Sequence, residues 1–383
     1  MPSNHAAVQL PLWYHQPFKA IYISTRLLSL IALLPFWTVL YTVTSRPRSS
    51  WSLRESVMVR LLRQLITLVA DTGISPLSTD KTHEVPQHEL KESSFIWISP
   101  ADSDAVRGPA VDELVKPVRI PGYVWPKGRT LDEDNSGGFV MLFIHGGGYM
   151  MGSGHESFPE LHIVREMYRL CNIESILSLD YRLTHEACHP GQLLDALAAY
   201  SHLINVANIE PSRIIVVGAC AGGHLALMLL RYLHDEKSLP LPRALMIFSP
   251  MVDMTIDEEL RNDVTKERPN SAIDALITSY IANSRFLGHH PKTLLASPLL
   301  SANLAPPGSY RGYPKTFISV GGCEIFEREC ANLAEMMLSD GVSVTLDVQQ
   351  DAVHDFWGFG VIVPSNLARL KLSEAVREWV KDL

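Results

Sequence analysis

A single cysteine, Cys220, stands among small residues at the end of an apolar run. The run from Ile214 to Val217 predicts a buried strand, and the residues from Gly222 onward predict a helix. Small residues on both sides let a strand turn sharply into a helix and project one side chain near the positive helix end. Because this pattern also fits ordinary crossovers, in which a buried cysteine is only a small apolar residue, other residues must identify a nucleophile.

Three consecutive glycines, 146–148, directly follow another apolar run. They cost backbone entropy unless the backbone itself is needed there. Exposed amides at that place can stabilise the negative oxygen that forms when a carbonyl is attacked. We therefore predict an oxyanion hole made by the amides of Gly146, Gly147 and Ala221, the last lying beside Cys220. The alternative is a plain glycine-rich turn.

An acid and a histidine follow the last two predicted strands. Glu324 lies just past one strand end, and His354 follows the final strand. The chain order Cys220, Glu324, His354 is the order of nucleophile, acid and base that this type of sheet uses. A carboxylate beside one ring nitrogen would fix the tautomer and stabilise the imidazolium, while the other nitrogen takes the thiol proton.

Neighbouring acids offer alternatives to this triad. Glu327 could replace Glu324, and either could be a solvated residue in the first turn of a helix; we favour Glu324 because it is nearer the strand end. Asp351 and Asp355 flank His354, but adjacent loop residues rarely point at a neighbour's ring.

No metal or cofactor is expected. The segment His185 to His189 matches H-E-x-x-H by letters, but Pro190 and Gly191 follow at once, which predicts a loop and not the helix that would place both histidines on one face. The pair 289–290 is two histidines with no acid or cysteine nearby at ligand spacing. No glycine-rich phosphate loop is present.

The elements that must position these residues alternate between strand and helix. Such alternation predicts an α/β fold with a mostly parallel sheet, helices on both faces and functional residues at the carboxyl ends of strands. The predicted strands are Phe95 to Ile98, Val118 to Val124, Phe139 to Ile144, Ser175 to Asp180, Ile214 to Val217, Ala244 to Phe248, Thr316 to Val320 and Val342 to Val348. The predicted helices are Glu160 to Leu170, Gln192 to Leu203, Gly222 to Leu233, Glu327 to Ser339 and Asn366 to Lys381.

One interval breaks the alternation. Residues 254–301 are charged and then turn helical near Ala272 to Ile281, so we interpret them as an insertion that covers the sheet edge as a lid. We divide the chain into an apolar segment (1–50), an amphipathic cap helix with a linker (51–92) and a catalytic domain (93–383).

The N-terminal segment predicts membrane association. Leu27 to Val43 carries no charge, although it is short for a spanning helix and contains Pro35. More arginines follow it than precede it, which would leave the catalytic domain in the cytosol on an endomembrane. The segment spans the bilayer or lies on it; an apolar helix packed on the cap is the alternative. Trp51 to Ile74 predicts an amphipathic helix with arginines on its polar side.

Composition excludes several classes. The net charge is −8, and the sequence has no basic stretch that would indicate binding to nucleic acid. Five cysteines without paired spacing favour neither a disulfide framework nor a zinc site, and there is no Asn-x-Ser/Thr sequon, which fits a reducing compartment. The oligomeric state is left open.

These motifs together resemble the hormone-sensitive-lipase-like branch of the α/β-hydrolase fold over about Phe95 to Leu383. The resemblance rests on His145-Gly146-Gly147-Gly148-Tyr149 with Gly152-Ser153, Asp180-Tyr181-Arg182-Leu183 followed by Pro190 and Asp195, Ser249-Pro250, Gly322 with Glu324, and His354-Asp355-Phe356. The N-terminal part resembles fungal membrane-associated members, including ones in secondary-metabolite pathways. The resemblance implies the α/β-hydrolase fold, the glycine box, the acid and the base.

The nucleophile position departs from this family. Members have Asp-Ser where this chain has Ala219-Cys220. A thiolate near a helix N-terminus and a histidine attacks thioesters, activated lactones and conjugated carbonyls well. It is also a better leaving group than an alkoxide, so plain ester hydrolysis is less favoured than for a serine relative.

Three functions fit this sequence. The first is a hydrolase or acyl-transfer enzyme that acts on an ester, lactone or thioester of an apolar small molecule through a Cys220 acyl-thioester. The second is a tailoring enzyme that catalyses cyclisation or condensation with His354 as base. The third is a non-catalytic, membrane-tethered binding protein, which the retained His354 and Glu324 disfavour.

Overall fold

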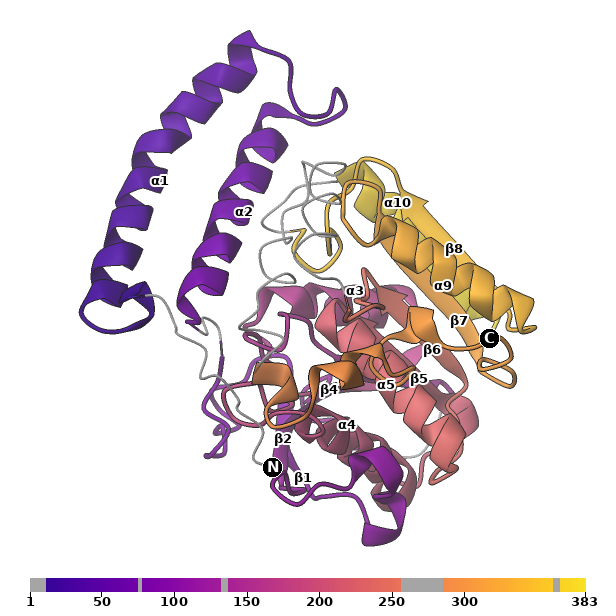
Figure 1. Cartoon of the computed structure of the whole chain (residues 1–383). Coiled ribbons are helices and arrows are strands. Elements are labelled where there is room, and N and C mark those ends of the chain that lie inside the picture. Colours follow the sequence, from indigo (N-terminus) through magenta and orange to yellow (C-terminus); the bar gives the residue numbers. More distant parts are fainter. Residues whose placement is uncertain (1–11, 75–77, 132–136, 256–284, 361–365) are drawn as a thin grey trace.

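The computed structural model describes residues 12–74, 78–131, 137–255, 285–360 and 366–383, around a central eight-stranded sheet (Figure 1). The strand order is β1-β2-β4-β3-β5-β6-β7-β8; β2 runs antiparallel to β1 and β4, and all other pairs are parallel. The prediction of a mostly parallel sheet is therefore confirmed. The strands are β1 (Ser94–Ile98), β2 (Ile120–Trp125), β3 (Phe139–Ile144), β4 (Ile173–Leu179), β5 (Ile214–Ala219), β6 (Ala244–Phe248), β7 (Lys315–Gly321) and β8 (Val344–Gln349).

Strand β5 lies inside the sheet between β3 and β6, and every one of its residues is buried. Burial on both faces is the reason that this strand is continuously apolar and not alternating. Ile144 at the end of β3 pairs with Gly218 near the end of β5. The segments that leave these two strands therefore start side by side, which brings the glycine box next to Cys220.

Helices join the parallel strands close to where the sequence predicts them. Helix α5 packs on β5, β6 and α4, α9 lies along β7 and β8, and α10 contacts α3. The helices are α1 (Phe18–Val43), α2 (Leu53–Thr72), α3 (His162–Leu170), α4 (Gly191–Ser201), α5 (Ala221–Glu236), α9 (Glu327–Ser339) and α10 (Asn366–Lys381).

The predicted insertion leaves and rejoins the fold at one place. The Met254 amide donates to Ser301 Oγ at 2.8 Å, and the Asn303 amide donates to the Val252 carbonyl at 3.1 Å. Both ends thus lie beyond the carboxyl end of β6. The helix predicted near Ala272 to Ile281 lies outside the described residues, and the role of the insertion as a lid stays a prediction.

Helices α1 and α2 form an antiparallel hairpin that stands beside the sheet domain (Figure 1). Leu30, Trp37 and Tyr41 of α1 are buried against apolar residues of α2. A capping box between Ser52 and Glu55 begins α2, satisfying amides that the first helical turn leaves without partners. The apolar segment and the amphipathic helix of the sequence analysis are therefore packed against each other.

The tip of this hairpin is fastened to the loop that carries His354. Trp51 is buried, and its Nε1 donates to the Asp351 carbonyl at 2.7 Å. Ser50 Oγ donates to the Asp351 carboxylate, also at 2.7 Å. Asp351, one of the acids considered as a triad member, thus anchors the N-terminal hairpin.

Candidate active site

Cys220 occupies a sharp turn between β5 and α5. Its backbone has φ 50° and ψ −117°, a region that costs a non-glycine residue about 1–3 kcal/mol and is kept where the surroundings enforce it. A Cβ atom at Gly218 would collide with the Gly222 carbonyl, and one at Gly222 would collide with the Ile144 carbonyl. The small residues around Cys220 are therefore required by the tight turn, as the sequence predicts.

His354 lies between an acid and the thiol. Its Nδ1 is 2.5 Å from Glu324 Oε2, and its side chain hydrogen-bonds that of Cys220. The second oxygen of Glu324, Oε1, accepts from the Gly321 amide at 2.5 Å and from Ser249 Oγ at 2.8 Å. Both carboxylate oxygens are thus held, which orients the imidazole toward the sulfur.

The surroundings favour a charged imidazole. Burial opposes the charge, but the Cys220 sulfur and the Glu324 carboxylate outweigh it and raise the pKa of His354 well above its usual value. An imidazolium beside sulfur is the arrangement that remains after the thiol proton has moved to the ring. The geometry therefore fits a general base paired with a thiol nucleophile.

The alternative acids are placed elsewhere. Glu327 begins α9, Asp351 binds the hairpin tip, and Asp355 turns toward Glu160. Among the described residues, Glu324 is the acid at the His354 ring. The three residues predicted as nucleophile, acid and base are thus brought together.

The glycine box departs from the prediction at one amide. The Gly146 amide donates to Glu160 Oε2 at 2.5 Å, so it is not free for an oxyanion, and its assignment to the oxyanion hole needs correction. Within the described part of the chain, the amides of Gly147 and Ala221 have no protein acceptor. These two remain as candidate oxyanion donors.

Glu160 and Asp355 form a carboxyl pair beside the site. Both side chains are buried; desolvation and the neighbouring carboxyl raise the pKa of Asp355, and desolvation raises that of Glu160 to about 7. Glu160 Oε1 and Asp355 Oδ2 have no partner unless a proton lies between the two groups. The sequence predicts Glu160 only as the start of a helix, because its contact with Asp355 joins segments that are far apart in the chain.

Buried polar residues support the glycine box. His145 stacks on Tyr181 with ring centroids 4.2 Å apart, and burial lowers its pKa to about 4. Tyr149 Oη lies 2.5 Å from His224 Nδ1, and His224 Nε2 lies 2.7 Å from the Leu300 carbonyl. The first turn of α5 is thereby tied to the glycine box and to the end of the insertion.

Other motif residues are structural. Asp180 accepts from Ser153 Oγ and from Thr79 of the linker, and Arg182 pairs with the buried Asp195 at 2.8 Å. Buried ion pairs with several hydrogen bonds hold loop geometry more than they contribute net stability. These residues therefore shape the loops around Cys220 without contacting it.

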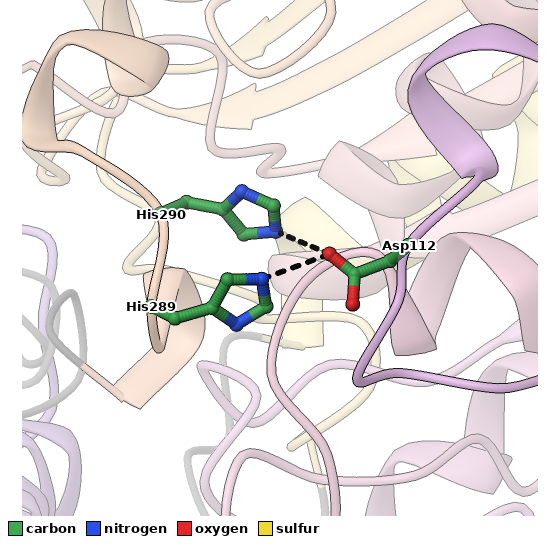
Figure 2. A group of neighbouring side chains, drawn as sticks. All are labelled: Asp112, His289 and His290. Atoms are coloured by element: carbon green, nitrogen blue, oxygen red, sulfur yellow. Dashed lines mark hydrogen bonds and ion pairs between the residues drawn. The ribbon is translucent and has the colours of Figure 1, made fainter.

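The two histidine motifs have different outcomes. His185 and Glu186 lie in a turn, as predicted, and Glu186 pairs with Lys81 at 2.7 Å. In contrast, His289 and His290 meet an acid that is 177 positions away from His289 in the sequence, Asp112, in a group that could hold a metal ion (Figure 2). Local spacing in the sequence does not predict this group, because its members come from distant segments of the chain.

Comparison with known proteins agrees with the fold. The profile of the alpha/beta hydrolase fold family matches residues 141–358, more than half of the chain. An acetyl-hydrolase of Streptomyces hygroscopicus is 27% identical over 73% of this chain and 83% of its own. Carboxylesterase NlhH of Mycobacterium tuberculosis is 27% identical over 59% of this chain and 69% of its own.

Solved structures agree at lower identity. Carboxyl esterase 2 of the fungus Tuber melanosporum has a TM-score of 0.62 at 16% identity, covering 85% of this chain and 98% of its own. A hormone-sensitive lipase from a metagenome library has a TM-score of 0.57 at 22% identity, covering 92% and 98%. The chain belongs to the alpha/beta hydrolase fold family.

Proposed function

We propose that this protein is a cysteine-dependent hydrolase or acyl-transfer enzyme acting on esters, lactones or thioesters of apolar small molecules. The placement of His354 between the Cys220 side chain and the Glu324 carboxylate carries the proposal. The esterase and acetyl-hydrolase names of the relatives support ester hydrolysis as the class of reaction. The resemblance to fungal membrane-associated proteins supports a secondary metabolite as substrate.

The reaction has two halves. The Cys220 sulfur attacks the carbonyl carbon after its proton has moved to His354, and the Gly147 and Ala221 amides stabilise the oxyanion. The bond to the leaving group breaks, and the leaving group takes the proton from His354, which leaves an acyl-thioester. Water or an acceptor alcohol then attacks, His354 accepts its proton, and the carbon–sulfur bond breaks to regenerate the thiol.

Sulfur sets the preferred acyl donor. In the tetrahedral adduct, a thiolate leaves more readily than an ordinary alkoxide, so the adduct of a plain ester returns to substrate. Thioesters, aryl esters and activated lactones have leaving groups that compete with the Cys220 sulfur. We therefore expect activated acyl donors to react faster than simple alkyl esters.

Trapping the acyl-enzyme tests this mechanism. The purified chain is mixed with thioester and aryl-ester probes, and its intact mass is measured. We expect one acyl group per chain, absent in Cys220→Ala and retained in the control Cys171→Ala, which alters a half-buried thiol elsewhere. Turnover that survives Cys220→Ala but not His354→Ala would contradict the acyl-thioester and favour condensation with His354 as base.

We further infer that α1 attaches the protein to a membrane surface. Helix α1 is long and apolar enough to cross a membrane and is mostly exposed, and it is the one such helix among the described residues. The apolar side chains that it exposes include Ile21, Leu28, Ile31, Phe36, Val39 and Val43. Such a face matches the interface of an endomembrane, with the catalytic domain on the cytosolic side.

The opposite face of α1 argues against spanning. Arg60 of α2 donates to Tyr41 at 2.9 Å and lies over the Trp37 ring, and Arg26 of α1 donates to Gln64 of α2 at 2.9 Å. A spanning α1 would carry these guanidinium groups into hydrocarbon, which is costly. An α1 that lies in the interface leaves them in water.

Vesicle flotation tests this attachment. With phosphatidylcholine and phosphatidylserine vesicles, we expect the full chain to float, and Ile31→Asp with Phe36→Asp to leave most of it in the soluble fraction. Leu370→Asp, at an equally exposed leucine of α10, is the matched control. Flotation of the double variant at the wild-type level would exclude α1 as the attachment.

A further inference from the structure

We propose that Asp112, His289 and His290 form a binding site for a divalent transition-metal ion, with Zn²⁺ the best match. Their ligand atoms, one from each residue, lie within 4.8 Å of one another. Two imidazoles and one carboxylate form a donor set that zinc and its first-row neighbours favour. The site is separate from Cys220 and plays no part in the proposed reaction.

The distances suit one ion. Asp112 Oδ2 lies 2.9 Å from His289 Nε2 and 3.3 Å from His290 Nε2 (Figure 2). Ligands held at about 2.0–2.1 Å around a tetrahedral ion stand about 3.3 Å apart. Both oxygen–nitrogen distances are close to this spacing, and the ligand atoms of the two histidines lie within 4.8 Å of each other. Figure 2 shows both rings directed at the same carboxylate oxygen.

The carboxylate is oriented before any ion arrives. Asp112 Oδ1 accepts from the amides of Leu114 and Val115, both at 2.7 Å, so Oδ2 is the oxygen that faces the histidines. Preorganised ligands of this kind lose little freedom on binding an ion.

The imidazoles are also positioned from behind. Cys188 Sγ lies 3.9 Å from Nδ1 of His289, so this nitrogen can carry the proton while Nε2 faces the ion. The His189 carbonyl lies 3.1 Å from His290 Nε2 and offers a further oxygen at ligand spacing. Gly288, with φ 60°, permits this approach, because a Cβ atom there would collide with Cys188.

The ion would join segments that are far apart in sequence. Asp112 precedes β2, whereas His289 and His290 lie in the described returning part of the insertion, residues 285–301. The side chain of His289 is 39% exposed and that of Asp112 6%, so an ion can enter from solvent and keep water as a ligand. A structural role follows: the ion fastens the returning end of the insertion to the sheet domain.

Packing contacts connect the proposed metal site to the glycine box. The Phe286 carbonyl accepts from the His189 amide at 2.7 Å, and the Phe286 ring stacks on Tyr149 with centroids 4.8 Å apart. Tyr149 directly follows the three glycines. Metal binding should therefore stabilise the fold near the active site without supplying a catalytic group.

Metal titration of the full chain tests the site. The protein is stripped with chelator, dialysed, and titrated with Co²⁺ alone by visible absorption and with Zn²⁺ alone by calorimetry. We expect one saturable ion per chain, visible bands of a low-coordinate Co²⁺ site and a rise in Tm with Zn²⁺. Asp112→Asn keeps an acceptor for the Leu114 and Val115 amides, so the fold should persist while affinity falls at least tenfold.

Two further variants complete the test. His290→Ala should lose the visible bands, whereas His88→Ala, which removes an 83% exposed histidine elsewhere, should keep them. Circular dichroism verifies that each variant is folded. Absence of saturable binding to the wild type, or binding that is unchanged in both Asp112→Asn and His290→Ala, would overturn the proposal and leave an ordinary histidine–carboxylate ion pair.

Discussion

The two histidine–carboxylate groups of this protein share a local design and differ in their surroundings. In each, one carboxylate oxygen accepts from a backbone amide while the other faces imidazole: Glu324 Oε1 binds the Gly321 amide, and Asp112 Oδ1 binds two amides. Glu324 faces one buried ring that also contacts a thiol, whereas Asp112 faces two partly exposed rings. Local hydrogen bonding orients both carboxylates alike.

The two groups differ in burial and in one neighbouring side chain, which is a thiol beside His354 and a second imidazole beside Asp112. We infer that these two differences set the chemistry of each group. Because His354 is buried beside a thiol, the role that we propose for it is proton transfer. Because Asp112 faces two partly exposed imidazoles, the role that we propose for it is ion binding.

The largest expected effect is a loss of acylation that leaves the metal site intact. His354→Ala and Cys220→Ala should each slow single-turnover acylation by about 10⁴-fold or more, and the double variant should be no slower, because the two residues act as one unit. Cys220→Ala should retain the Co²⁺ bands. Stopped-flow measurement of leaving-group release and metal titration check both statements. A Cys220→Ala protein without a metal site would show that the two groups are coupled.

The next effect concerns the buried carboxylate. Glu324→Gln should reduce kcat by about 10³-fold with little change in KM, because the imidazolium loses its negative partner and the ring its fixed tautomer. Steady-state kinetics with an aryl ester measure this loss. Glu327→Gln is the matched control, and it should show only a small fraction of that loss. A larger loss of kcat in Glu327→Gln than in Glu324→Gln would indicate that Glu327 is the acid of the triad.

The third effect is a pH dependence of stability caused by the Glu160 and Asp355 pair beside His354. The pKa of Glu160 rises from 4.5 to about 7 on burial, so the folded protein keeps a proton that the unfolded chain releases between these values. The free energy of unfolding should therefore fall as pH rises through this window, by up to about 3 kcal/mol. Glu160→Gln, which mimics the protonated carboxyl, should flatten this dependence in urea titrations. An unchanged slope in the variant would show that Glu160 does not hold that proton.

The smallest expected effect is a change in Zn²⁺ affinity at the group of Asp112, His289 and His290. Cys188 contacts the far nitrogen of His289, as Glu324 contacts the far nitrogen of His354. A neutral thiol orients a ring less firmly than a carboxylate, so Cys188→Ala should weaken Zn²⁺ binding by about tenfold. Calorimetry measures this change, with Cys171→Ala as control. A complete loss of binding would make Cys188 a direct ligand.

Much of the candidate active site is predictable from sequence because each of its parts carries a local signal. Gly218 and Gly222 beside Cys220 are required because a Cβ atom at either position would collide with backbone atoms. Glu324 and His354 each follow a strand of a parallel sheet, and such strands end at one edge. The occupied Gly146 amide was not predictable, since Glu160 reaches it from the start of the next helix.

The alternation of strands and helices, the tight turn at Cys220 and the positions of Glu324 and His354 after strand ends follow from the sequence alone, because burial and backbone sterics act on neighbouring residues. The contact of Glu160 with Asp355, the attachment of Trp51 to the His354 loop and the meeting of Asp112 with two distant histidines are visible only in the folded chain. Such contacts depend on how loops close in space, and loop closure leaves no periodic pattern in the chain.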